Sequence, residues 1–125
     1  MNDAAVTPVA WRRRHAPRHY LGTLSTNDVG FRLEGREPAT GIELSLSIPF
    51  SQIEEILAPN GSADLLAGAP AVVLRLAGSE PVLVREAGSA PREAGDLARA
   101  LSGLRSRARR RGARARSATR ERRTR

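Results

Sequence analysis

The stretch from Ile42 to Ile48 alternates strictly between apolar and polar residues, and this alternation restricts the possible folds more than any other feature. Every even-numbered position is Ile or Leu, and every odd-numbered position is Glu or Ser. Side chains of a β-strand point alternately to opposite faces, so such a segment presents one apolar and one polar face. The pattern predicts a strand in an antiparallel sheet that is buried on one face and exposed to solvent on the other.

Other segments fit the same kind of sheet. Residues 20–26 and 29–33 are joined by the turn-forming pair Asn27-Asp28, which predicts a hairpin. Residues 71–78 and 81–86 form a second pair of expected strands around a tight connection that contains Gly78. The chain is therefore expected to contain several short antiparallel strands.

The segment 50–57 follows Pro49, which removes a donor from the ladder, so the strand is expected to end or bend there. Ile53, Ile56 and Leu57 then lie at helical spacing. The pattern fits either one helical turn or a short bent strand.

An amphipathic helix is expected near the C-terminus. Leu97, Leu101 and Leu104 recur at intervals of four and three residues, and Ala94 and Ala98 widen the stripe. The helix could extend to about residue 110, because Ala and Arg are good helix formers. It could cap one end of a curled sheet or lie on the face of an open one. The last dozen residues have nothing to bury and are predicted to be disordered.

Charge divides the chain into three parts. Residues 105–125 carry eleven arginines against one acid, whereas residues 20–104 carry six arginines and eleven acids, a net −5. We therefore expect a flexible basic arm over 1–18, one small domain over 19–104, and an Arg-rich disordered tail over 105–125.

Composition excludes several classes of site. The chain has no Cys, which excludes disulfides, thiolate metal sites and a cysteine nucleophile. The N-terminus resembles no secretory signal, and no run approaches the roughly 20 apolar residues of a transmembrane helix. These features predict a cytoplasmic protein, with any membrane contact peripheral and on the inner face. The chain contains no Lys, which indicates a GC-rich coding bias of the bacterial type.

Two stretches resemble the pleckstrin-homology-like (PH-like) superfold in its bacterial and GRAM-type variants. They are GTLSTNDVGF at 22–31 and LSIPFSQIEEI at 46–56, similar to the family patterns G-x-L-x-L-T-x-x-x-L-x-F and I-P-L-x-x-I-x-x-V. The resemblance covers residues 20–104. It implies a bent, barrel-like sheet of seven strands capped by a C-terminal helix, in a binding or adaptor module that is not an enzyme.

The resemblance also bears on lipid recognition. Its phosphoinositide-binding members carry a basic cluster around the first hairpin. In this chain the turn that we take as its equivalent is Ser25–Asp28, with no cation before Arg32. This argues against the inositol-phosphate pocket of those members.

The arginines are the candidate binding residues. A flexible polycation attracts anionic lipid at about 1 kcal/mol per basic residue near the surface. The same arginines could bind phosphates of a nucleic acid or ribosome. The third interpretation is that the tail is a solvated end without a binding role, enriched in arginine by coding bias alone. Trp11 is a candidate interfacial anchor, and the alternative is a flexible arm whose tryptophan packs on the domain. The candidate anion-binding residues are Arg105, Arg107, Arg109, Arg110, Arg111, Arg114 and Arg116 in the tail, and Arg12, Arg13 and Arg14 in the arm.

No catalytic, metal or cofactor site is expected. His15 and His19 are four residues apart, but Pro17 lies between them and no third ligand is near in sequence. The adjacent acids Glu54 and Glu55, and Glu34 and Glu37 in an expected loop, are all expected on a solvated surface. No nucleophile or phosphate-loop motif occurs. The expected partners are an anionic lipid surface or a membrane protein, with nucleic acid as the alternative; no small-molecule substrate is evident.

Overall fold

The computed structural model describes residues 6–59 and 65–123, and of residues 112–123 it describes the backbone alone. Nine strands, one 3-10 turn and one α-helix follow each other along these residues. Their bounds are β1 Thr7–Arg13, β2 Tyr20–Thr26, β3 Gly30–Arg36, β4 Glu43–Pro49, η1 Phe50–Gln52, β5 Ile53–Leu57, β6 Leu65–Leu66, β7 Ala69–Pro70, β8 Val72–Leu76, β9 Val82–Glu86 and α1 Ala94–Arg123.

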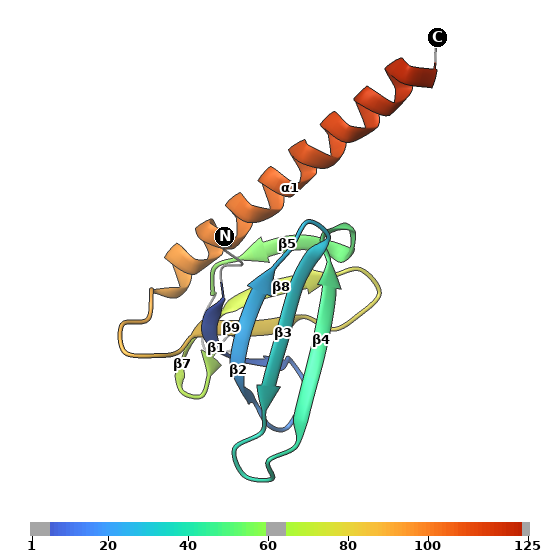
Figure 1. Cartoon of the computed structure of the whole chain (residues 1–125). Helices are drawn as coiled ribbons and strands as arrows, with labels where there is room; N and C mark the ends of the chain where they lie inside the picture. Colours follow the sequence, from blue (N-terminus) through green and yellow to red (C-terminus); the bar gives the residue numbers. More distant parts are fainter. Residues whose placement is uncertain (1–5, 60–64, 124–125) are drawn as a thin grey trace.

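Seven of the strands form one antiparallel sheet in the order β4-β3-β2-β1-β9-β8-β5. The sheet curls on itself, and α1 lies across the end next to β5 (Figure 1). Strands β4 and β5 are the two edges of this curled sheet, because each is last in the strand order. The fold is mainly β with one C-terminal helix, as the sequence predicted.

Two glycines stand where neighbouring strands come very close. A Cβ on Gly22 would lie 1.9 Å from the carbonyl oxygen of Glu34, and one on Gly30 would lie 2.1 Å from that of Ile48. No side chain fits such distances, so these positions require glycine. Both lie in the half of the sheet formed by β2, β3 and β4, where glycine permits the close approach.

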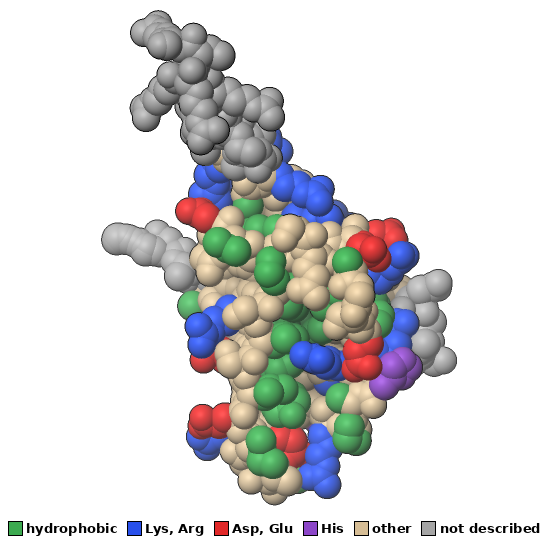
Figure 2. All heavy atoms as spheres, turned by 90° about the vertical axis from the view of Figure 1, so that its right-hand side faces the viewer, with side chains coloured by type: hydrophobic (Ala, Val, Ile, Leu, Met, Phe, Trp, Pro, Cys, Tyr) green, Lys and Arg blue, Asp and Glu red, His purple; other side chains and the backbone are tan. Residues whose placement is uncertain are grey.

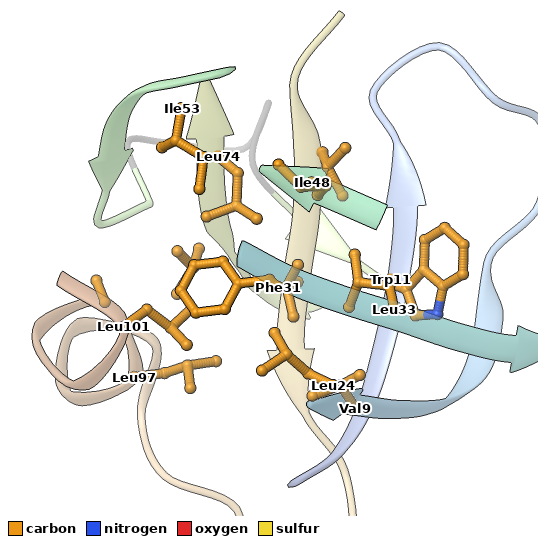
Figure 3. Packing of buried hydrophobic residues seen from close by; sticks show 14 of the residues in the cluster. Val9, Trp11, Leu24, Phe31, Leu33, Ile48, Ile53, Leu74, Leu97 and Leu101 are labelled. Carbon is orange, nitrogen blue, oxygen red and sulfur yellow. The ribbon is translucent and has the colours of Figure 1, made fainter. Parts of the chain in front are cut away.

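The core fills the concave side of the curled sheet. Leu24, Leu33 and Phe31 from β2 and β3 meet Leu74 of β8 and Leu101 of α1 in this cluster (Figure 3). Phe31 and Phe50 pack edge to face, with ring centroids 5.1 Å apart. Fully burying an aliphatic or aromatic side chain of this size contributes about 1.5–3 kcal/mol. The helix thus completes the core.

A second, smaller cluster lies on the other side of the sheet. The β6–β7 hairpin brings Leu66 over β1, β8 and β9, where it packs with four residues, namely Ala10, Ala71, Val73 and Leu83. Strand β8 is consequently buried on both faces, which explains its nearly continuous apolar sequence.

A buried carboxylate connects β9 to the start of the helix. Glu86 is 8 % exposed and accepts hydrogen bonds from the backbone N–H of Arg92, at 2.9 Å, and from its guanidinium. A buried charge needs such partners. The pair fixes the segment that leads into Ala94, and Leu97 and Leu101 then face the core.

The structure corrects the expected boundaries at both ends. Within the expected flexible arm 1–18, Thr7–Arg13 instead forms β1 between β2 and β9, and residues 1–5 lie outside the described residues. The predicted disordered tail is not confirmed either, since α1 continues as one helix to Arg123. The packed turns around Leu101 already provide the costly nucleus, and Ala and Arg then propagate the helix.

Two further expectations were incomplete. The segment 50–57 was expected to be either a helical turn or a short bent strand, and it contains both. A 3-10 turn at Phe50–Gln52 is followed by strand β5. The alternation in β4 was read correctly as a strand, but its apolar face is buried only at its C-terminal end. Ile48 is 1 % exposed, whereas Leu44 and Ile42 are 40 % and 60 % exposed.

Candidate anion-binding site

The helix α1 is the element that carries the arginine cluster. It is 30 residues long, or about 45 Å at 1.5 Å per residue. Its first turns pack on the sheet, and the remainder extends beyond the β domain (Figure 1). The last large apolar side chain in the chain is Leu104, so the segment after it has little to bury. The arginines are therefore arranged on a rod attached to the domain.

Arg105 stabilises the fold and is not one of the exposed arginines of the helix. Its guanidinium donates to the carbonyl oxygen of Ile53 at 2.6 Å and to that of Glu54 at 3.4 Å. Burial lowers the pKa of Arg105, and the positive charge of Arg109 lowers it further. Arg105 was among the strongest candidates from the sequence, and the structure uses it to join the helix to β5.

The next arginines are exposed. Arg107, Arg110 and Arg111 line a shallow hollow of about 360 Å³ together with Leu104, and Arg109 is exposed as well. Arg111 lies 3.4 Å from the carboxylate of Asp28 in the β2–β3 turn. This pair is solvent-exposed and therefore weak. The side chains of Arg114 and Arg116 are outside the described residues.

Trp11 is not an interfacial anchor. Its side chain is fully buried in β1, stacks on Tyr20 with ring centroids 5.0 Å apart, and donates from Nε1 to the carbonyl oxygen of Glu34 at 3.1 Å. The apolar ring and its one donor are both satisfied inside the protein. The alternation of Val9 and Trp11, two residues apart, was the available signal for this strand.

The arginines next to Trp11 belong to the first hairpin of the sheet. Arg12 and Arg13 end β1, and Arg14 begins the connection to β2, where its N–H donates to the carbonyl of Pro81. The guanidinium of Arg12 donates to backbone carbonyls, including that of Leu65 at 3.4 Å, whereas Arg13 is exposed. The first hairpin is thus β1–β2, and not the hairpin around Asp28 that we expected.

This correction changes the charge of the first hairpin. The β1–β2 connection contains Arg14, His15, Arg18 and His19, with no acid. The first hairpin therefore does carry basic residues, of which Arg18 pairs with Glu37 of the neighbouring β3–β4 connection. The turn around Asp28, which lacks a cation, belongs to the next hairpin and does not argue against an anion-binding pocket at the first.

A small hollow lies beside this connection. It encloses about 310 Å³ between the β1–β2 and β3–β4 connections, and Tyr20 and Glu37 are among its lining residues. Glu37 is buried and accepts from the hydroxyl of Thr40 at 2.6 Å and from its N–H at 2.5 Å, with Arg18 at 3.5 Å. The hydroxyl of Thr40 and the other donors lower the pKa of Glu37, despite its burial. These contacts connect Glu37 to both the β3–β4 and the β1–β2 connections.

The two basic groups lie at opposite ends of β2. The basic connection precedes Tyr20, and the turn that contacts Arg111 follows Thr26. A seven-residue strand spans about 20 Å, and Figure 1 shows the helix at one end of the sheet and these connections at the other. The structure therefore does not bring Arg12–Arg14 together with the helix arginines.

Three of the four acids expected on a solvated surface are exposed, whereas Glu37 is buried by its contacts with Thr40 and Arg18. Glu54 and Glu55 are exposed and both pair with Arg75, and Glu34 is exposed and pairs with Arg32. Among residues 6–59 and 65–123, no group of three His, Cys, Asp or Glu could hold a metal ion. No helix in that part of the chain is long and apolar enough to cross a membrane.

Comparison with known proteins gives a similarity of fold. No protein-family model matches the chain, and no curated protein matches it in sequence. Among solved structures it is similar to the crystal structure of the C-terminal domain of an unknown protein from Leishmania infantum, with a TM-score of 0.53 and 12 % sequence identity. The match covers 82 % of this chain and 84 % of that chain. At this identity the similarity concerns the fold alone.

Proposed function

We propose that this protein is a non-enzymatic PH-like or GRAM-like binding module that associates with an anionic membrane surface through its arginine helix. The fold class supports this, because a curled sheet of seven strands with a C-terminal helix is what the sequence resemblance implies. The single observation that carries the proposal is the continuation of α1 to Arg123. That helix holds ten arginines after Leu104 against one acid, Glu121.

The helix binds by charge rather than by insertion. After Leu104 it contains no large apolar residue, so it lacks the apolar face of an interfacial amphipathic helix. Each basic residue near an anionic bilayer contributes about 1 kcal/mol. The domain body carries −5 and is repelled by the same surface. A helix that extends from the body can reach the lipid while the body stays at a distance.

The basic first hairpin supports lipid as the anion. Phosphoinositide-binding members of the PH-like superfold carry their basic cluster around that hairpin, and here it contains Arg13, Arg14 and Arg18. We propose the hairpin as a second, weaker contact that acts apart from the helix. Two weak contacts on one surface reinforce each other through effective concentration.

The experiment compares two matched variants of the full chain. One carries Arg→Gln at 114, 116, 120 and 122, and the other carries Arg→Gln at 32, 36, 75 and 99, which are exposed positions of the body. Both lose four charges, and Gln keeps the helix propensity of Arg. Vesicles with and without anionic lipid are then titrated with each protein. We expect the helix variant to bind anionic vesicles at least about tenfold more weakly, and the body variant to bind like the original chain.

A nucleic acid is the second candidate partner. The purely electrostatic character of the helix after Leu104 favours it, because a helix fits the major groove and arginine contacts phosphates. Each phosphate contact adds about 0.9 to the slope of log affinity against log salt. If duplex DNA is the partner, the helix variant will lower that slope by about 3–4 and vesicle binding will be weak for every variant.

A further inference from the structure

Strand β4 is an edge of the sheet that the described residues leave unpaired. It is last in the strand order of the described sheet, and the strand that it pairs with there is β3. Edge strands expose backbone N–H and C=O groups and are usually protected by charges, proline or a covering element. In β4 the charge and the proline are confined to the ends, at Glu43 and Pro49.

The opposite edge of the sheet is protected. At β5 the pairing contains an irregularity between Ile53 and Glu55. Arg105 also reaches from α1 to the carbonyl oxygens of Ile53 and Glu54. A bulge and a covering side chain are both devices that prevent edge pairing. The contrast shows that the fold closes one edge and leaves the other available.

The register with β3 defines which groups of β4 are free. The carbonyl of Ile42 accepts from Glu37, and the N–H of Phe50 donates to Val29. Backbone groups alternate in direction along an antiparallel strand. The even-numbered residues of β4 therefore bond to β3, and the N–H and C=O groups of Glu43, Ser45 and Ser47 point outward.

These three residues are complementary to their own two-fold copy. With Ser45 opposite Ser45, each Glu43 lies opposite a Ser47, so all three outward residues are paired and no two acids face each other. On the apolar side Leu44 then lies opposite Leu46. If the second strand is shifted by two residues so that Glu43 lies opposite Pro49, then Pro49 enters the ladder without a backbone N–H to donate.

The side chains of β4 also support pairing with a second copy of the strand. Leu44 is 40 % exposed although it lies on the apolar face of an edge strand. Figure 2 shows hydrophobic side chains gathered in a strip down the side of the molecule where β4 is outermost. We propose that β4 pairs with β4 of a second copy of this chain, antiparallel and centred on Ser45. The two curled sheets would then form one continuous sheet across a two-fold axis.

A cysteine pair tests the register directly, because the natural chain has no Cys. Directly opposite residues in a hydrogen-bonded pair have Cα atoms about 5.5 Å apart, within the range that a disulfide bridges. We expect Ser45→Cys to form a disulfide-linked dimer under mild oxidation. The control is Ser47→Cys on the same face, whose Cα atoms would be about 14 Å apart and too distant to bridge.

Sedimentation equilibrium of the full chain provides the second measurement. We expect a dimer, and we expect Ser45→Pro to be a folded monomer by circular dichroism, because the lost N–H points outward and an edge strand tolerates proline. Three results would each overturn the proposal: a monomeric original chain, a dimer that survives Ser45→Pro, or a Ser47→Cys variant that links as fast as Ser45→Cys. If Ser45→Pro fails to fold, the cysteine comparison still decides.

Discussion

Trp11 is the one tryptophan of the chain, and its indole ring is buried against Tyr20. Its fluorescence therefore reports on the core. Because the ring does not reach the surface, we expect no shift of the emission maximum when anionic vesicles are added to the folded protein. A shift to shorter wavelength at saturating lipid would show that Trp11 enters the bilayer and would contradict its position in β1.

The same residue has a large role in stability. Truncation of a buried tryptophan typically costs about 3–5 kcal/mol, and Trp11→Ala also removes the hydrogen bond from Nε1 to the carbonyl oxygen of Glu34. We expect urea unfolding to show a loss of this size, with a smaller loss for Trp11→Phe. A loss below about 1 kcal/mol would place the ring outside the core.

Glu37 makes the stability depend on pH. The Thr40 hydroxyl and the other donors lower the pKa of Glu37 in the folded protein. Its ionised form therefore stabilises the fold above the ordinary carboxyl pKa, and this contribution is lost as the pH falls through the lowered value. We expect Glu37→Gln to be less stable than the original chain at neutral pH, and the difference to shrink at about pH 3.

An exposed acid provides the control for that measurement. Glu34→Gln removes a carboxylate whose partner Arg32 lies 3.3 Å away on the surface. Such exposed pairs contribute little, so this variant should follow the original chain at each pH. Thermal unfolding of the three proteins gives the comparison. A gap between Glu37→Gln and the original chain that is constant or grows on acidification would contradict the lowered pKa.

The element on which the proposed function most depends is the second half of α1. Gly112 lies inside it, and glycine costs about 1 kcal/mol relative to alanine in a helix interior, whereas proline costs about 3 kcal/mol. We expect Gly112→Ala to strengthen the helical circular dichroism signal at about 222 nm and Gly112→Pro to weaken it, if the segment is one helix. Equal spectra for both variants and the original chain would indicate that this segment is not helical in solution.

Several strands could be predicted from the sequence because their pattern is local. The prediction for 20–26 coincides with β2, and those for 42–48 and 81–86 are within one residue of β4 and β9. Strand β1 was missed because only Val9 and Trp11 carry its alternation, between a proline and a run of arginines. Its pairing with β9, more than 60 residues away in the sequence, is a long-range contact that no local pattern predicts.

The candidate site was harder to predict for the same reason. Sequence alone gives the number of arginines but not their partners. Arg105 is one residue beyond the apolar stripe, and the fold turns it toward β5. The basic first hairpin could not be predicted, because the pattern of its first strand, β1, is too weak to identify. In both cases the decisive information is which segments pair, and that depends on the whole sheet.

The whole molecule is strongly polarised. The chain carries a net charge of +8, yet the body over residues 20–104 is acidic and the surplus of arginine lies in the helix that extends from it. Such a charge distribution favours attachment by the helix and repulsion of the body, in contrast to a flat basic face. The same polarity explains why net charge alone cannot identify the anionic partner.

A competition between two anions tests the proposed function most directly. The full chain is mixed with anionic vesicles and a short DNA duplex that present equal total charge, at about 0.15 M salt, where exposed charges act only within roughly 8 Å. We expect most of the protein to sediment with the vesicles, and the helix variant with four Arg→Gln substitutions to remain free. Recovery of the full chain on the duplex, or an equal loss of vesicle binding in the body variant, would contradict the proposal that the arginine helix binds a membrane surface.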